Sequence, residues 1–556
     1  MFMDKFRKAA IKAISEVVDL SNKDIDTLIE TPPDSKLGDL AFPCFSLGKF
    51  FKMSPGSIAT QLRQKIKVAK TFSKIEVHGP YLNFYFSSEA LAKEVAKRVK
   101  SEGRNYGSTN IGKGKKVLIE HTSINPNASP HIGRARNALI GNSLVQIYKF
   151  LNFKPEVHYY VNDIGKQIAM LVLAAGTRNP KFSELLNLYV KINKKIQKYP
   201  SKEKEVFDLL HKLESGDVRV RKRFKDIVEI CIKGQSKILG QLGIKYDYFD
   251  YESKYLFNKS VNKILKRLEK SKKLLTDEDG RLYLDLHDYK LPMKNPVFVL
   301  TRSDKTSLYG LRDLAYTEYK LSSAKDNIMV LGEDQKLYYL QTKAGMDLLG
   351  LSMPDVVHYS FVLLKSGKMS TRQGKVVLLE DFMKEVYTNV KKEIKNRKRG
   401  RMSSVEAIGN SAVIYSILKT TPEKNVIFDL DRAVSFEGDT GPYLQYTHAR
   451  INSLLKKKRI TRTINGKLTN ESEREVLKKV YNFQEVVINT YNSKKPSTVA
   501  NYLMDLAKTF NSYYSQNLII SDNKELTSHR LAVCSTVKQV LNNGLSLLGI
   551  EAVSEM

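Results

Sequence analysis

Two short stretches, more than two hundred residues apart, contain side chains suited to binding a nucleoside triphosphate. In the first, residues 130–133, Gly133 would let a nucleotide approach the backbone, while His131 and the free amides of a helix start face phosphate oxygens. The second, residues 365–375, is a small cationic loop in which Lys368 would neutralise charge as pyrophosphate departs. The two stretches predict the halves of one ATP site. The candidate ATP-binding residues are Pro130, His131, Gly133, Lys368, Met369 and Ser370.

The residues around the first stretch predict the elements that position it. Residues 117–120 form an apolar run typical of a strand, and a loop rich in Ser, Asn and Pro follows. Residues 135–151 are apolar at helical spacing, so the stretch lies between a strand and a helix. From residue 116 to about 385 strands and helices alternate, which favours a parallel sheet covered on both faces. A Lys-rich helical stretch at about 178–235 interrupts this pattern and is interpreted as an insertion.

In their order and context, the two stretches resemble the two signatures of class I aminoacyl-tRNA synthetases. Residues 120–141 are similar to the arginyl-tRNA synthetase form of the first signature, including the Arg-Asn-Ala-Leu-Ile-Gly at its end. Residues 436–450 resemble the start of that family's anticodon-binding helices, and residues 540–551 have its C-terminal form. The resemblance to this family therefore covers essentially the whole chain.

The resemblance implies a ligase that activates L-arginine with ATP and transfers it to tRNA(Arg), giving arginyl-tRNA, AMP and pyrophosphate. The arginine carboxylate would attack the α-phosphorus of ATP, so catalysis needs positioning and cations instead of a strong base. The aminoacyl group would then pass to the 3'-terminal adenosine, and the family generally needs bound tRNA before activation. ATP is a substrate, Mg²⁺ is expected on its phosphates, and no zinc is expected. The residues expected to act in catalysis are His131, Gly133, Arg134, Lys368 and Arg372.

An arginine pocket needs carboxylates placed for forked hydrogen bonds, which also reject lysine. Glu120 ends the expected strand, and Tyr309 and Asp313 lie four residues apart at a strand-to-helix junction. The Tyr309 and Asp313 pair resembles the family's guanidinium-binding pair, and the same likeness gives Asn125 and Gln335 to the α-amino and α-carboxyl groups. Taken without the likeness, Asp313 would be a charge at a helix N-terminus and Tyr309 a core aromatic.

The region after residue 400 is predicted to be helical and basic. Its expected helices are 405–420, 442–457, 471–492, 497–516 and 528–548. Tyr443 and Tyr446 lie three residues apart and share a helix face with Arg450. Such a pair usually belongs to a core. The family resemblance instead places aromatic residues here beside the tRNA anticodon loop, where stacking on bases is a strong contact.

The expected fold is a multidomain α/β protein with three modules. Residues 1–107 form a small α/β N-terminal domain that the resemblance assigns to tRNA contact, with strands in 74–86 that turn at Gly-Pro. Residues 114–390 form a doubly wound, Rossmann-like catalytic domain with an insertion around 178–290 and hairpins at 276–286 and 296–309. Residues 400–556 form an all-α anticodon-binding bundle.

The composition favours an RNA partner in the cytoplasm. The chain has 92 Lys and Arg against 59 Asp and Glu, a formal charge of +33 that attracts a polyanion. No apolar run is long enough to span a membrane, so no membrane partner is expected. Cys44, Cys231 and Cys534 stand singly, which is typical of a reducing cytoplasm and indicates no metal site. The family likeness favours a monomer.

Three positions depart from the family pattern. Arg134 replaces the usual second His of the first signature but keeps a cation for phosphate, Tyr338 replaces a frequent His, and Thr371 replaces the lysine that often closes the second signature. The alternatives are a class I synthetase for another amino acid, a noncatalytic RNA-binding relative, and a nucleotidyltransferase of the superfamily. An apolar substrate would leave Glu120 and Asp313 unpaired. A noncatalytic relative would be expected to have lost residues of the ATP motifs, whereas His131, Gly133 and Lys368 are present. A nucleotidyltransferase would not need the helical C-terminal region.

Overall fold

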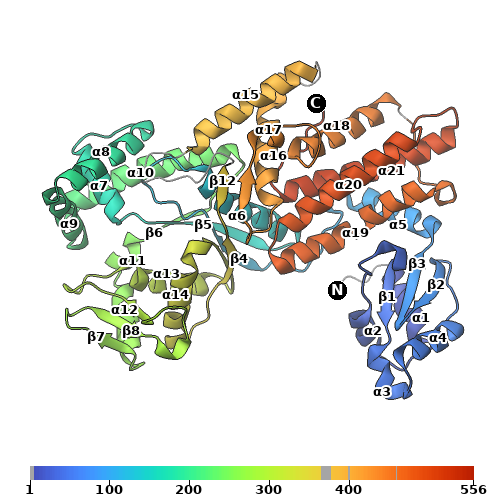
Figure 1. The fold of residues 1–556 in the computed structure, drawn as a ribbon, viewed down its shortest axis with the longest axis horizontal. Helices are drawn as coiled ribbons and strands as arrows, with labels where there is room; N and C mark the ends of the chain where they lie inside the picture. Colours follow the sequence, from blue (N-terminus) through green and yellow to red (C-terminus); the bar gives the residue numbers. More distant parts are fainter. Residues whose placement is uncertain (1–4, 365–376, 398–400, 459) are drawn as a thin grey trace. The chain divides into compact units, whose positions relative to one another are not determined.

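The computed structural model describes residues 5–364, 377–397, 401–458 and 460–556. The chain forms two compact units, and each unit is assembled from segments that are far apart in the sequence (Figure 1). The first unit comprises residues 1–109, 447–486 and 503–543. The second unit comprises residues 110–446, 487–502 and 544–556.

A parallel five-stranded sheet forms the centre of the second unit, as the alternating pattern predicted. Its strands, in the spatial order β11-β10-β4-β5-β6, are Asp355–Tyr359, Asp326–Gly332, Lys116–Glu120, Lys154–Val161 and Tyr248–Tyr251. Val117, Leu118 and Ile119 of β4 have no exposed surface. A strand that is buried on both faces reads as a continuous apolar run, which is why β4 is recognisable in the sequence.

The strand order reverses between β4 and β10. From β4 the chain builds β5 and β6 on one side, and it then returns to place β10 and β11 on the other side. Connections that leave two neighbouring parallel strands in opposite directions open a crevice beyond their carboxyl ends, where open α/β sheets bind ligands. Glu120 of β4 lies opposite Met329 of β10 at this point.

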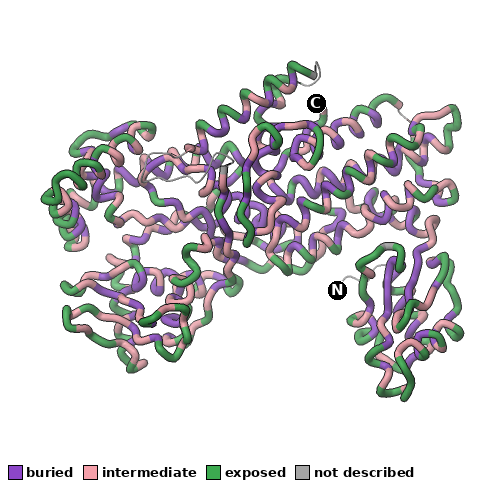
Figure 2. The backbone as a smooth tube through the Cα atoms, viewed as in Figure 1, coloured by how far each residue is buried: buried purple, intermediate pink, exposed green. Residues whose placement is uncertain are grey.

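Helix α6 (Ile132–Phe150) follows the first motif and packs against β4, β5 and β10. It starts at Ile132 instead of the expected residue 135, because His131 takes an extended N-cap conformation. Most of the helix is buried, as Figure 2 shows. A Cβ atom on Gly141 would lie 2.3 Å from the ring of His121, so this glycine lets the helix approach the end of β4.

The insertion is helical, as predicted, and contains α8 (Leu185–Lys198), α9 (Ser201–Glu214) and α10 (Val218–Gln241). A small antiparallel sheet follows, with β7 (Leu274–Thr276), β8 (Leu282–Asp285) and β9 (Val297–Val299) in that order. The expected hairpin at 276–286 is present, and Gly280 turns it with a φ of +80°. Residues 300–308 turn back on themselves at 303–305, as expected, because an isolated antiparallel bridge joins Thr301 to Ser307 and Leu308 donates its amide to the carbonyl of Leu300 at 2.8 Å. The strand β9 itself pairs with β8.

The first unit contains an antiparallel sheet with the order β1-β3-β2. Its strands are Leu40–Pro43, Tyr81–Phe86 and Phe72–His78 in that order, with α1 (Lys5–Ser15), α2 (Asn22–Leu28), α3 (Gly48–Phe51), α4 (Pro55–Lys65) and α5 (Ser88–Glu102) in the same region. The predicted turn at Gly79 and Pro80 joins β2 to β3, and Gly79 has a φ of +56°. Asp39 links this region to two cations from the C-terminal part of the same unit, Arg474 at 2.9 Å and Lys478 at 2.5 Å.

The C-terminal region is helical, as predicted. Its helices are α16 (Val405–Leu418), α17 (Leu430–Ala433), α18 (Gly441–Lys457), α19 (Glu471–Ser493), α20 (Ser497–Gln516) and α21 (Lys524–Leu547). Helix α21 starts before the expected residue 528, because the Asn523 side chain accepts the amide of Leu526 at 3.0 Å and caps the helix.

The remaining elements lie in the second unit. They are α7 (Lys166–Ala175), α11 (Ser253–Phe257), α12 (Ser260–Glu269), α13 (Tyr309–Ser323), α14 (Lys336–Leu348), α15 (Leu379–Arg397), β12 (Val362–Leu364) and β13 (Val426–Phe428). Among the described residues, none of the helices combines the length and apolar character that a membrane span requires.

Candidate active site

The loop after β4 is held in an unusual backbone conformation. Thr122 and Ser123 have φ values of 88° and 35°, a region that residues with a side chain rarely occupy. The Asn137 side chain of α6 accepts the amide of Thr122 at 2.5 Å and donates to the carbonyl of Val330 in β10 at 2.8 Å. Asn137 therefore ties the loop to both sides of the crevice, and such held conformations are found at functional sites.

His131 and Gly133 line a cavity of about 230 Å³. Its other lining residues are Arg134, Gly332, Asp334, Tyr359, Phe361, Val362 and Leu363. Burial, and then the charge of Arg134, lower the pKa of His131 to about 4, so the imidazole is neutral near pH 7. Its Nδ1 atom is buried and has no partner in the structure. A neutral imidazole can donate one hydrogen bond to a phosphate oxygen without carrying a charge of its own.

Described residues on both sides of the second motif lie close to the first motif. Lys368, Met369, Ser370 and Arg372 themselves lie outside the described residues. After the motif, Leu379 donates its amide to the carbonyl of Pro130 at 2.8 Å, and Ile132 donates to Val377. Before the motif, residues 361–363 line the cavity that contains His131. The fold therefore brings the residues that flank the second motif to the first motif, which is consistent with one ATP site.

A second cavity, of about 240 Å³, lies at the carboxyl ends of β4 and β10. The predicted residues Glu120, Asn125, Arg134, Asp313 and Gln335 all line it. The other lining residues are Ser123, Asn137, Tyr160, Tyr316, Thr317, Lys320, Met329, Leu331, Gly332, Tyr338, Tyr339, Thr342, Met353 and Tyr359. Arg134, Gly332 and Tyr359 also line the His131 cavity, so the two cavities adjoin.

Glu120 forms a buried ion pair within this second cavity. Lys320 of α13 donates to its Oε2 at 2.5 Å, and both side chains are almost fully buried. The Lys320 ammonium also lies 4.4 Å from the centre of the Tyr316 ring. The charge of Glu120 is therefore largely balanced by Lys320, a partner that no sequence motif indicated.

Asp313 has no such cationic partner among the hydrogen bonds and ion pairs of the described residues. The Tyr338 hydroxyl of α14 donates to its Oδ2. Burial, and then the nearby charge of Glu252, raise the pKa of Asp313 to about 7. Tyr309, expected beside it, is 54% exposed and is absent from the cavity lining, although its ring centre lies 5.0 Å from that of Tyr338. Asp313 is thus the carboxylate whose charge a bound cation could balance.

Asn125 and Gln335 are exposed at the cavity and bond to polar neighbours. The Asn125 amide donates to Gln167 at 3.1 Å, and the Gln335 amide donates to Asp334 at 3.2 Å. These exposed amide groups, which lie in the segments that follow β4 and β10, could exchange their partners for the polar groups of an amino acid.

The predicted anticodon residues lie along α18. Tyr443, Tyr446 and Arg450 are half-buried, while the residues between them are buried. Arg450 donates to Asn511 at 3.3 Å, and its guanidinium lies 5.6 Å from the Tyr514 ring centre. The predicted spacing therefore places all three side chains at partly exposed positions.

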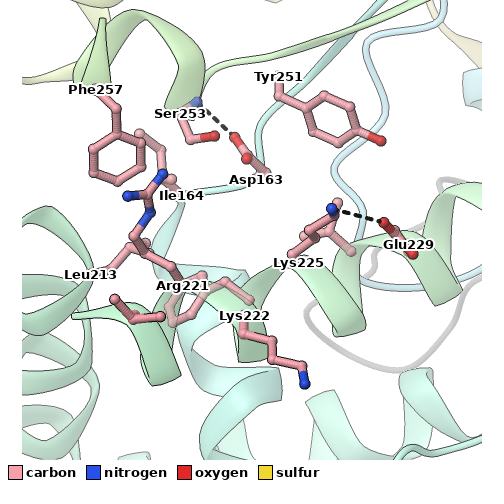
Figure 3. Close-up of a pocket in the computed structure, with 13 residues that line it drawn as sticks. Asp163, Ile164, Leu213, Arg221, Lys222, Lys225, Glu229, Tyr251, Ser253 and Phe257 are labelled. Atoms are coloured by element: carbon pink, nitrogen blue, oxygen red, sulfur yellow. Dashed lines mark hydrogen bonds and ion pairs between the residues drawn. The ribbon is translucent and has the colours of Figure 1, made fainter. Parts of the chain in front are cut away.

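A further cavity, of about 670 Å³, adjoins helix α10 of the insertion (Figure 3). Arg221, Lys222 and Lys225 line it, and the Arg221 guanidinium lies 3.9 Å from the centre of the Phe257 ring. Opposite these cations, Asp163 accepts the amide of Ser253 at 2.9 Å. Both residues follow the carboxyl ends of strands β5 and β6, the edge of the sheet that also carries the other two cavities.

Among the residues that the structure describes, no three His, Cys, Asp or Glu side chains come together to hold a metal ion. Cys44, Cys231 and Cys534 are buried, free thiols. The carboxylate that lines the His131 cavity is Asp334.

Three family models match the chain in succession. Residues 4–86 match "Arginyl tRNA synthetase N terminal domain", and residues 95–430 match "tRNA synthetases class I (R), catalytic domain". Residues 444–556 match "DALR anticodon binding domain". The order agrees with the three predicted modules.

Similar proteins extend over the full length. An arginine–tRNA ligase of Methanocaldococcus jannaschii is 35% identical, with 98% of this chain and 99% of that protein aligned. One of Clostridium perfringens is 34% identical over 99% of this chain and 100% of its own length. The solved arginyl-tRNA synthetase of Thermus thermophilus superimposes with a TM-score of 0.83 at 25% identity, covering 100% of both chains. The Plasmodium falciparum structure, at 20% identity, has the same fold with a TM-score of 0.80 and 100% coverage of both chains.

Proposed function

The chain belongs to the class I arginyl-tRNA synthetases and is an arginine–tRNA ligase, and on that premise we propose how its residues carry out the reaction. The full-length relatives are arginine–tRNA ligases, which sets aside a synthetase for another amino acid, a noncatalytic relative and a simple nucleotidyltransferase. The observation that carries the proposal is the pair of adjoining cavities at the β4–β10 reversal. One cavity contains His131 and the other contains Asp313.

In the activation step, an arginine carboxylate oxygen bonds to the α-phosphorus of ATP and the bond to pyrophosphate breaks. We assign the ATP phosphates to the His131 cavity, with Gly133 allowing close approach and Arg134 supplying charge at the boundary with the second cavity. Neutral His131 would donate a hydrogen bond to a phosphate oxygen. Lys368 and Arg372 would stabilise the charge of the departing pyrophosphate, and Met369 and Ser370 would contact the nucleotide.

Magnesium is expected to enter with ATP. Mg²⁺ usually keeps several waters and binds substrate phosphates together with one or two carboxylates. Asp334 lines the His131 cavity, is exposed, and fits that role with one oxygen ligand. Bound there, the ion would neutralise phosphate charge.

In the arginine cavity, Asp313 would bind the guanidinium with a forked or single hydrogen bond. Tyr309 would cover the guanidinium from its exposed position. Glu120 would accept a hydrogen bond from arginine through its Oε1 atom, because its Oε2 atom already accepts one from Lys320. Asn125 and Gln335 would hold the α-amino and α-carboxyl groups, which places the reacting carboxylate toward the His131 cavity.

For tRNA, we assign Tyr443, Tyr446 and Arg450 to the anticodon loop. We assign Arg221, Lys222 and Lys225 to the phosphates of the incoming 3' strand. This assignment is supported by their positive charge and by their position at the same sheet edge as the arginine cavity.

Because the thiols of all three cysteines are free and buried, we also expect a cytoplasmic enzyme, and we expect it to act as a monomer.

The test is ATP–pyrophosphate exchange with each of the twenty amino acids, with and without tRNA, alongside attachment of labelled arginine to total tRNA. We expect exchange with arginine alone, and only when tRNA is present. Exchange with a different amino acid, or arginine exchange that is unaffected by Asp313→Asn, would contradict the proposed roles.

A further inference from the structure

Two tyrosine hydroxyls lie around the Asp313 carboxylate, and each comes from a different element. Tyr338 of α14 donates to Oδ2 of Asp313. Tyr160 of β5 lines the same cavity, and its buried hydroxyl also interacts with the Asp313 carboxylate and favours its charged form. A phenol oxygen that donates its proton keeps lone pairs that can accept, so the position is suited to a ligand that supplies a donor.

Both tyrosine rings are fixed by aromatic neighbours. Tyr160 stacks on Tyr316 with ring centres 4.2 Å apart and planes inclined by 7°. Tyr338 contacts Phe298 edge to face at 5.8 Å and Tyr309 at 5.0 Å. Because the rings cannot turn freely, the two hydroxyls have defined positions relative to Asp313.

The other buried charges near Asp313 are already paired. Lys320 binds Glu120 at 2.5 Å, and Arg312 binds Glu252 at 2.6 Å. Asp313 receives a hydrogen bond from a neutral hydroxyl, which orients the carboxylate and leaves its charge in place. A cation that reaches this carboxylate would therefore meet the two Asp313 oxygens and the lone pairs of the Tyr160 oxygen.

We propose that Tyr338 is a positioning residue that holds Oδ2 of Asp313, and that Tyr160 is a further binding residue whose oxygen accepts an N–H of the substrate guanidinium. The inference rests on the proposed placement of arginine in this cavity. The planar guanidinium has N–H donors on more than one edge, so it can donate to Asp313 and to Tyr160 at the same time. The ammonium group of lysine carries all of its donors on one nitrogen atom and does not match this arrangement.

The experiment compares Tyr338→Phe and Tyr160→Phe with the wild-type enzyme. Each removes one hydroxyl and keeps the ring, so the packing is retained. We expect each variant to raise the KM for arginine about tenfold, with the KM for ATP and for tRNA unchanged. Tyr289→Phe is the matched control, because Tyr289 donates to Asp347 at 2.8 Å outside the cavity, and it should leave the KM for arginine unchanged.

A second measurement separates positioning from general stability. The Tyr338 hydroxyl favours the charged form of Asp313, whose other titratable and charged neighbours are Glu252, Lys320 and Tyr160. In Tyr338→Phe, the pH below which the KM for arginine increases should therefore move upward. Tyr338→His, which restores a donor, should recover part of the affinity. Thermal unfolding of each variant identifies any loss of fold.

An unchanged KM for arginine in both phenylalanine variants would overturn the inference. So would an equal rise in the KM for all three substrates, or an unmoved pH profile in Tyr338→Phe. Failure of the proposed arginine site is distinguishable, because Asp313→Asn would then also leave the KM for arginine unchanged.

Discussion

Leu379 donates its backbone amide to the carbonyl of Pro130 at 2.8 Å. This bond joins residues on the far side of the cationic motif to the start of the His-containing motif, across more than two hundred positions of sequence. The cavity containing His131 is completed by residues 361–363, which precede the cationic motif. The residues that flank the cationic motif therefore lie beside the His-containing motif.

Arginine binding should depend on pH near neutrality. Burial raises the pKa of Asp313 to about 7, and the guanidinium binds its ionised form. Because protonation opposes binding, the KM for arginine should increase about tenfold for each pH unit well below that pKa and level off above it. Binding near pH 7 should also release protons. Calorimetry in buffers of different ionisation enthalpy measures that release, and an absence of proton release would contradict the assignment.

His131 should act as a neutral group. With a pKa lowered to about 4, it does not titrate between pH 6 and 8, so the rate of activation should show no step from this residue there. His131→Ala should lower kcat about a hundredfold, because a donor to the phosphates is lost. His211→Ala, in helix α9 of the insertion, is the control and should retain activity. If His131→Ala retains the wild-type kcat, His131 does not take part in the reaction.

Gly141→Ala should destabilise the protein by about 1–3 kcal/mol, because overpacking forces neighbouring groups to move. The added Cβ would meet the buried ring of His121 at 2.3 Å. Gly240→Ala is the matched control, since no atom lies within 4 Å of its added Cβ, and it should stabilise by about 0.4–1 kcal/mol. Thermal or denaturant unfolding compares the two, and equal effects would mean that α6 can move away from His121.

Lys222→Glu combined with Lys225→Glu should raise the KM for tRNA about tenfold or more, and should reduce the dependence of that KM on salt. The KM for arginine should stay unchanged. Lys263→Glu combined with Lys266→Glu, two exposed positions on α12, changes the net charge equally and is the control. If the control raises the KM for tRNA as much, the cavity of Figure 3 has no particular role and general charge explains the effect.

Local sequence patterns predicted the elements that have local causes. The continuous apolar residues of β4, the Gly-Pro turn between β2 and β3, and the helical spacing after residue 400 each determine structure within a few neighbours. The predicted starts of α6 and α21 were less accurate, because the capping residues His131 and Asn523 determine where these helices begin. The turn at 303–305 was predicted correctly, whereas the pairing of β9 with β8 was not predicted, because it is a tertiary contact.

The features of the candidate site also divide into those that sequence motifs predict and those that depend on tertiary contacts. Glu120, Asn125, Asp313 and Gln335 were identified through motifs, and the fold brings them to one cavity. The ion pair of Glu120 with Lys320 joins residues that are far apart in sequence, so no spacing rule indicates it. Tyr338 was recognised as a departure from the family pattern. Its bond to Asp313 became visible only with the packing of α13 and α14.

The measurement that tests the account most directly is the steady-state kinetics of Asp313→Asn with arginine as the varied substrate. Removing the charge from the guanidinium partner should raise the KM for arginine about a hundredfold or more, with tRNA affinity unchanged. Asp347→Asn, which alters a carboxylate that accepts the Tyr289 hydroxyl outside the arginine cavity, should behave as wild type. If Asp313→Asn binds arginine as well as the wild-type enzyme, the cavity between β4 and β10 does not select arginine through Asp313.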